Sequence, residues 1–158
     1  MSVMVTIRGK KFPLCLTVSA LDKINENCGG IGGIMDYLKG CPSEVALLNA
    51  DQLDTAGVTK EQWEMEKLEA ASRAKYNNAW MLGLLVQEGE ENRLIEERFL
   101  DGGDRMRRPV PGPEDLVHLL TPGQIEGYRL SILRAVTEGM KRTFEAESLK
   151  NVDQAEER

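Results

Sequence analysis

The architecture of this chain depends on residues 59–89, TKEQWEMEKLEAASRAKYNNAWMLGLLVQEG. Apolar and small residues recur there at spacings of three and four, the period of one face of an α-helix; they are Met65, Leu68, Ser72, Tyr76, Ala79, Leu82 and Val86. Thr59 and Gln62 have the spacing of a capping box, in which each side chain bonds the other residue's backbone N–H. The pattern predicts a long helix that begins at Thr59, keeps this face inward and ends near Gly89.

Eight consecutive apolar residues, AWMLGLLV at 79–86, lie within that helix. A helix buried on one face needs only an apolar stripe. A run that is apolar all round therefore indicates either a place at the centre of the domain or a second apolar contact. In the second case Trp80, Leu84 and Leu85 would face a partner protein, because large aromatic residues commonly anchor interfaces. Both interpretations stay open at this point.

Upstream of the long helix, residues 3–16 have the pattern of a β-hairpin. Val3, Val5 and Ile7 alternate with other residues at the strand period, and Gly9 suits a turn. Pro13 has no N–H to donate, so the second strand should keep a partly unpaired edge. A lone hairpin is only marginally stable, so we expect this one to pack on helices or to be extended by a partner's strand.

Three short helices are predicted between the hairpin and residue 59. The first runs from Ser19 to the glycines at 29–30, and the second passes through Leu38. The third is expected over 43–53, with its apolar side chains inward. The glycine-rich stretch at 29–33 follows a helix rather than a strand, which favours a helix-to-helix turn over a phosphate-binding loop.

Downstream, the sequence predicts a short acidic helix over 88–101, a break at 102–112 and a helix that starts at Pro113. Another capping signal at Thr121 opens a helix expected to reach Glu147. The predicted fold is mainly α: one helical domain over 1–147 with the short N-terminal hairpin packed on it. Residues 148–158 are polar and are expected to form a disordered tail.

The bulk composition limits the classes of function. The chain has 158 residues, which suggests one domain, and a formal net charge of −6. Binding along nucleic acid or on an anionic membrane needs clustered positive charge, so the acidic balance argues against both partners. The longest apolar run is too short to span a bilayer, and no signal peptide is visible. We therefore expect a cytoplasmic protein.

Residues suited to catalysis or metal binding are sparse. Cys15, Cys28 and Cys41 are 13 residues apart, whereas zinc sites need close pairs, so reduced thiols and no metal are expected. His118 is the only histidine, and one Asp115-x-x-His118 motif cannot supply a di-metal bundle. A catalytic site built on His118 is a weak alternative. The sequence predicts a non-enzymatic protein without a cofactor.

Two charged segments complete the candidate sites. The acidic stretch 88–97 includes arginines and lacks an EF-hand pattern, so it is interpreted as a solvated helix face. Arg105, Arg107 and Arg108 could meet phosphate, but in an acidic protein they more often pair with acidic protein surface, their own or a partner's. The candidate partner-binding residues are thus Trp80, Leu84, Leu85, Arg105, Arg107 and Arg108.

Three stretches resemble the tail assembly chaperones of siphophages and prophages of Gram-positive bacteria. They are VTIRGKKFPLCLTVSALDKINE at 5–26, NNAWMLGLLVQEGEENRL at 77–94 and PVPGPEDLVHLLTPGQIEGYRLSILRAV at 109–136. The opening is similar to the family's I-x-G-K-x-Y/F-P-L hairpin, which stands here at 7–14 and is followed at once by an amphipathic helix. These motifs are structural, and the family has no catalytic residues to carry over.

The resemblance implies a mainly helical adaptor in the host bacterial cytoplasm. Such chaperones bind the tape measure protein, keep it soluble and help recruit major tail tube protein. Many self-associate, many have a second, longer frameshifted form, and they are not expected in the mature virion. The main alternative is another phage structural protein, such as a head–tail joining component, which would remain in the particle. A weaker alternative is a nucleic-acid-binding regulator that uses Arg105, Arg107 and Arg108.

Overall fold

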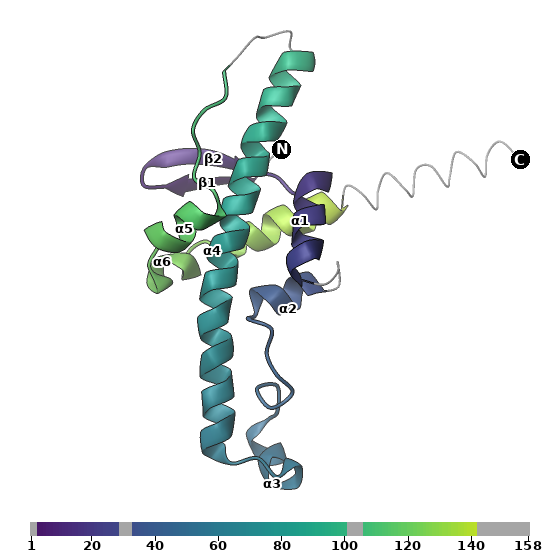
Figure 1. Ribbon diagram of the computed structural model, residues 1–158, viewed down its shortest axis with the longest axis vertical. Coiled ribbons are helices and arrows are strands. Elements are labelled where there is room, and N and C mark those ends of the chain that lie inside the picture. Colours follow the sequence, from purple (N-terminus) through teal and green to yellow (C-terminus); the bar gives the residue numbers. More distant parts are fainter. Residues whose placement is uncertain (1–2, 29–32, 101–105, 142–158) are drawn as a thin grey trace, which may run out of the picture.

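One helix, α4 (Lys60–Phe99), runs the length of the molecule, and the other elements lie along it (Figure 1). The computed structural model describes residues 3–28, 33–100 and 106–141. At 40 residues, α4 is about 60 Å long. It begins as predicted: Thr59 Oγ1 accepts from the Gln62 backbone N–H, and the Gln62 side chain accepts from Thr59 N–H, both at 3.2 Å.

The helix continues past Gly89, so the predicted end at Gly89 and the separate helix over 88–101 were wrong. Gly83 and Gly89 serve close contacts instead. A Cβ at Gly89 would lie 2.0 Å from the Pro13 carbonyl oxygen, and one at Gly83 would lie 2.4 Å from the Pro113 nitrogen. Both neighbours are backbone atoms, which cannot swing aside. Glycine here lets other segments reach the backbone of α4 without ending the helix.

The predicted hairpin is present as β1 (Val3–Ile7) and β2 (Lys10–Leu14), which pair antiparallel. Arg8 and Gly9, with φ of 51° and 82°, form the two-residue turn, whose positive φ angles fit the twist of the strands. Val5, Ile7 and Leu14 are buried, and β2 lies against α4.

Contacts beyond the hairpin hold both of its strands. Pro13 lies against Gly89, so the edge expected to be partly unpaired is covered within the chain. The Tyr128 hydroxyl donates to the Thr6 carbonyl oxygen at 2.9 Å, and the Cys15 backbone N–H donates to the Leu85 carbonyl oxygen at 3.2 Å. The hairpin is therefore joined to α4 and to the C-terminal part of the described chain.

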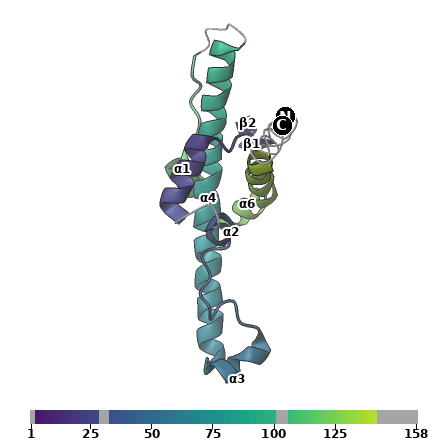
Figure 2. The ribbon, with the colours of Figure 1, turned by 90° about the vertical axis from the view of Figure 1, so that its right-hand side faces the viewer.

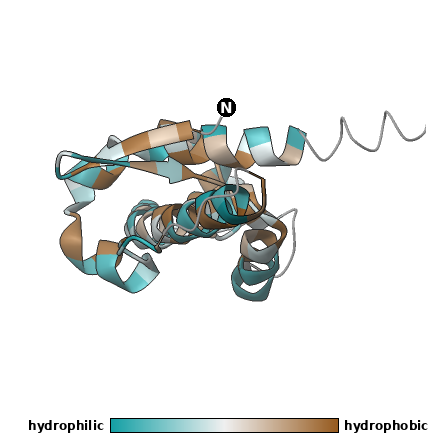
Figure 3. Ribbon diagram, turned by 90° about the horizontal axis from the view of Figure 1, so that it is seen from above, coloured by the Kyte–Doolittle hydropathy of each residue, from teal (hydrophilic) through white to brown (hydrophobic). Residues whose placement is uncertain are grey.

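Seen from above, other elements of the chain lie on more than one side of α4 (Figure 3). On one side lie α1 (Val18–Cys28) and α2 (Ile34–Leu38); on the other lie α5 (Pro113–Leu119) and α6 (Pro122–Glu126) (Figure 1). Residues 129–141 are also helical and run across α4. The fully buried side chains include Ile24 of α1, Leu85 of α4, Leu116 of α5 and Ile132 of residues 129–141. The mainly helical fold with a packed hairpin is confirmed.

The C-terminal helix differs from the prediction. The helix expected from Thr121 to Glu147 is interrupted at 127–128, where the Gly127 and Tyr128 N–H groups bond carbonyls three residues back. This tight turn brings Tyr128 to the hairpin. The part of the expected helix beyond 141 and the expected tail at 148–158 lie outside the described residues, as does most of the glycine-rich turn at 29–33.

The prediction of a single helix over 43–53 was also wrong. A turn at 44–47 is followed by the 3₁₀ helix η2 (Ala50–Gln52) and by α3 (Leu53–Ala56). Asn49 is extended, and its backbone N–H donates to the Gln52 side chain at 2.8 Å, so a new start at this point replaces the single helix. The segment, called the foot (residues 41–58), is fixed to α4 because Trp63 Nε1–H donates to the Leu48 carbonyl oxygen at 3.0 Å and Ser43 Oγ–H to Glu66 at 3.0 Å.

The close contact at Gly89 predicts the effect of adding one methyl group. Gly89→Ala should lower the free energy of unfolding by about 1–2 kcal/mol, because the clash with Pro13 outweighs the better helix propensity of alanine. The matched control is Gly123→Ala, where a helical Cβ meets nothing within 4 Å and stability should hold or rise slightly. Thermal unfolding followed by circular dichroism measures both. Equal stability of the two variants would contradict this packing.

Candidate functional site

The apolar run at 79–86 forms the centre of the core. Leu84 and Leu85 are 1% and 0% exposed, and Met81, Leu82 and Val86 are also buried. The first interpretation, central burial, therefore holds, and the prediction that Leu84 and Leu85 face a partner was wrong. Trp80 is half-buried, and its ring meets that of Tyr37 edge to face at 6.1 Å. It helps to hold α2 on α4.

The arginines of the predicted site pair with this chain's own carboxylates. Arg107 forms an ion pair with Glu91, and Arg108 with Glu90 at 3.2 Å. Of the two outcomes expected for these arginines, pairing within the chain is the one found. Arg105 lies outside the described residues. The pairs fix residues 106–112, here called the strap, along the C-terminal half of α4.

Glu90 is the centre of this network, and its side chain is almost fully buried. It accepts from Arg93 Nε at 2.9 Å, from the Arg108 backbone N–H at 2.8 Å and from the Arg108 guanidinium. The Arg93 hydrogen bond is the main cause that lowers the pKa of Glu90 from 4.5 to about 2; burial opposes the shift, and Arg108 adds to it. Arg93 also bonds Glu97, and its own pKa is raised.

Glu88 is the second buried carboxylate on α4. It accepts from the Thr17 hydroxyl at 2.8 Å and pairs with Lys23 at 3.3 Å, which joins the start of α1 to α4. The interpretation of 88–97 as a solvated face was therefore wrong for Glu88 and Glu90. Apart from Arg93, which is one turn from Glu90 on α4, their partners lie at 17–23 and 106–108, far away in sequence, so no local pattern could show that these glutamates are buried.

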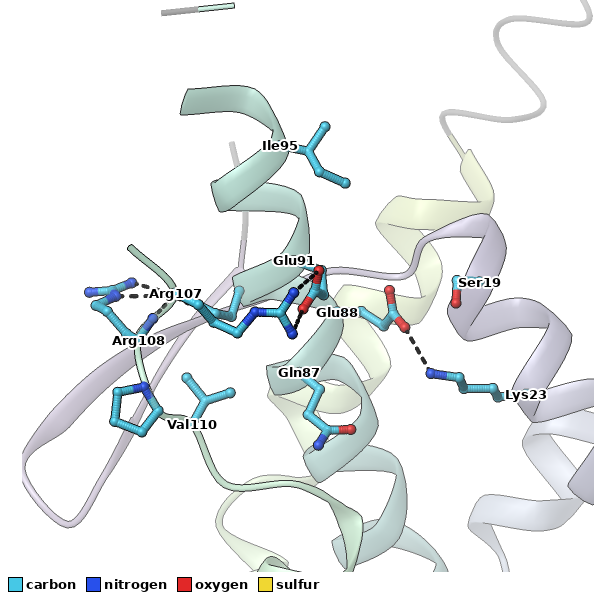
Figure 4. A pocket seen from close by; sticks show the side chains of 11 residues that line it. Ser19, Lys23, Gln87, Glu88, Glu91, Ile95, Arg107, Arg108 and Val110 are labelled. Carbon is cyan, nitrogen blue, oxygen red and sulfur yellow. Dashed lines mark hydrogen bonds and ion pairs between the residues drawn. The ribbon is translucent and has the colours of Figure 1, made fainter. Parts of the chain in front are cut away.

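A cavity of about 680 Å³ lies between α1, α4 and the strap (Figure 4). The cations that line it are Lys23, Arg107 and Arg108, and each is paired with a glutamate of α4. An entering anion would have to displace a carboxylate that is already in place. We interpret the cavity as the space around three ion pairs that hold α1 and the strap on α4.

The predicted apolar stripe of α4, whose residues recur at spacings of three and four, has a buried part and an exposed part. The sequence did not indicate this division. Ala79, Leu82 and Val86 are buried as predicted, but Met65, Leu68 and Tyr76 are 60%, 69% and 52% exposed. The predicted inward face was wrong for this first half of α4. We call Met65, Leu68, Ser72 and Tyr76 the open stripe.

The opposite face of the same half of α4 is covered. Asn77 and Asn78 donate side-chain N–H groups to the carbonyl oxygens of Tyr37 and Leu38, both at 2.8 Å, and Trp63 bonds the foot. Figure 2 shows this half of α4 extending away from the hairpin and α6 toward α3. The foot and α2 thus stabilise the projecting helix and leave the open stripe uncovered.

The open stripe leads into an apolar groove of about 430 Å³ between α4 and the pair α5 and α6. Its walls include Leu68, Tyr76, Ala79, Val117, Leu120 and Ile125. Lys75 also lines the groove and pairs with Glu126 on α6. Together, the open stripe and the groove form the candidate protein-binding surface.

Comparisons of this chain with models of protein families, with curated proteins and with solved structures find no match. In the part of the chain that the structure describes, no helix is long and apolar enough to cross a membrane. Within the same ranges, no three His, Cys, Asp or Glu side chains gather as a metal site would require. His118 is exposed on α5.

Two leucines of α4 test the division into a buried and an open half. Leu84→Ala should cost about 2–5 kcal/mol of unfolding free energy, since it leaves a cavity in the core. Leu68→Ala, the same change on the exposed half, should stay within about 0.5 kcal/mol. Urea unfolding measures both. A large loss at Leu68 with none at Leu84 would reverse the assignment.

The Glu90 network predicts how stability depends on pH. The pKa of Glu90 is lower in the folded chain than its ordinary value of 4.5. Its contribution is therefore full above about pH 4.5 and is lost as the pH falls toward 2; the shift to about 2 corresponds to about 3 kcal/mol. In urea titrations, wild type should lose about this much more than Glu90→Gln over that range. Parallel pH profiles would show that Glu90 does not act in this way.

Proposed function

We propose that this chain is a tail assembly chaperone of a long-tailed phage or prophage, which binds the tape measure protein and helps recruit major tail tube protein. The observation that carries the proposal is the open stripe, a row of four exposed side chains along the projecting half of α4, of which Met65, Leu68 and Tyr76 are large and apolar. Scattered exposed apolar residues are normal on protein surfaces, but a contiguous row beside an apolar groove is typical of a protein-binding site.

The packing of the three resembling stretches supports the proposal. Residues 5–26 meet residues 77–94 where Pro13 approaches Gly89, and residues 109–136 meet them where Pro113 approaches Gly83. Tyr128 then returns to Thr6 of the first stretch. The similarity therefore covers segments that form one packed unit, which is what a shared fold would require, while the open stripe at 65–76 lies outside them.

The physical demands of the role fit this surface. A tape measure protein is long, helical and apolar enough to aggregate, so its chaperone needs exposed apolar anchors within a charged, soluble periphery. The net charge of −6 favours solubility. In this proposal the protein acts in the host bacterial cytoplasm without chemistry of its own, associates with itself during assembly and leaves before the virion matures.

Co-expression tests the proposal. The tape measure protein from the same gene cluster should be largely insoluble alone. With this chain present, it should move into the soluble fraction and co-elute with it in size-exclusion chromatography. Tape measure protein that stays in the pellet while this chain elutes alone would contradict the proposal. Mass spectrometry of purified mature particles gives a second test. If it finds this chain in stoichiometric amounts, the result would contradict the proposal and favour a head–tail joining component.

A further inference from the structure

We infer that the open stripe and the groove bind one amphipathic helix from a separate polypeptide, laid along α4 with its apolar face inward. The inference rests on the proposed function only for the identity of that polypeptide, the tape measure protein. The surface and the kind of segment that it takes follow from the geometry of α4, α5 and α6.

The face of α4 that carries the open stripe already binds a helix further along. In its C-terminal half, α5 lies against α4, with Pro113 approaching Gly83 and Leu116 fully buried. Val117 of α5 and Leu120, the residue just past its end, line the groove. α5 thus gives an example, within this chain, of what this face accepts: a helix that packs through branched apolar side chains. The open stripe continues the same face toward the foot.

The charges around the surface favour an apolar segment over a charged one. The open stripe itself carries no charged side chain. On one flank Arg73 forms an ion pair with Glu69, and on the other Lys75 pairs with Glu126. Because these flanking charges are already compensated within the chain, an acidic peptide, a basic peptide or nucleic acid would gain little from them. An apolar helix face gains by covering exposed side chains.

The exposed area favours a partner helix over a second copy of this chain. The three large side chains of the open stripe expose on the order of 100 Å² each. Two copies that paired only through these stripes would bury roughly half of the ~1,200 Å² of a small stable interface. A single helix can also enter the groove and cover Val117, Leu120 and Ile125, which adds contact area on a second wall.

The length of the surface sets the length of the segment. From Met65 to Ala79 the helix rises about 21 Å, so the bound segment needs roughly 14 residues. Its apolar residues should recur at i, i+3 or i+4, and i+7, the pattern of helix-in-groove recognition.

Photo-crosslinking tests the site and its occupant together. p-Benzoylphenylalanine replaces Ser72, at the centre of the open stripe, and separately Val18, which is 88% exposed at the start of α1 on the other side of α4. Each variant is co-expressed with the tape measure protein, purified and irradiated. Position 72 should crosslink to the tape measure protein at least tenfold more than position 18. Mass spectrometry should place the crosslink in a segment with the three-and-four apolar pattern.

The other outcomes overturn the inference in distinct ways. A crosslink between two copies of this chain identifies a self-association surface instead. If the tape measure protein co-elutes but does not crosslink at position 72, it binds elsewhere on this chain. That outcome rejects the inference and agrees with the proposed function. A crosslink in a segment without helical periodicity rejects the helix. Failure of the unsubstituted pair to co-elute, with no crosslink, rejects both the proposed function and this inference.

A second variant pair gives a readout that does not depend on the crosslinker. Leu68→Glu places a charge in the open stripe, and Val18→Glu places one on an equally accessible apolar residue away from it. Both should keep the wild-type circular dichroism spectrum and unfolding midpoint. Leu68→Glu should reduce the co-eluting tape measure protein at least tenfold, and Val18→Glu should leave it unchanged. Equal co-elution with two folded variants would overturn the inference.

Discussion

The close approach of two chain segments to the backbone of α4, at Gly83 and Gly89, is the constraint on which the rest of the structure depends. A glycine within a helix costs about 1 kcal/mol relative to alanine. This helix contains both because Pro13 and Pro113 contact its backbone there. The hairpin and α5 are thereby placed within two turns of each other along α4. The core forms between them, around residues 81–86.

The position of the core explains why one helix has two surfaces of different character. Around its C-terminal half, α4 is enclosed by the hairpin, α1 and the strap, and the buried Glu88 and Glu90 fix the last two through charged hydrogen bonds. Around its N-terminal half, α2 and the foot cover one face, and α6 reaches it beside the groove, where Lys75 pairs with Glu126. The apolar pattern continues over both halves, so the uncovered part is left as the open stripe. The surface that we propose for binding thus continues a core-facing stripe beyond the core.

Much of the fold could be predicted from local signals. The alternation of Val3, Val5 and Ile7, the capping pair Thr59 and Gln62, and the mainly helical class agree with the structure. The predictions that failed depended on distant partners. Whether Gly89 ends a helix or receives another segment is decided by Pro13, 76 positions away by residue number. Likewise, periodicity marks Leu68 and Val86 as one face but cannot show that only Val86 has something packed on it.

For the candidate site, the sequence indicated the same helix but a different part of it: the most apolar run is core, and the surface that we propose for binding lies one to four turns earlier. Hydrogen–deuterium exchange on free and tape-measure-bound chain tests this claim most directly. Binding should slow exchange at residues 64–80 and 117–125, where the proposed helix covers α4 and the groove, and should leave residues 84–94 unchanged. Slowed exchange confined to the strap or to α1, with residues 64–80 unaffected, would contradict the account.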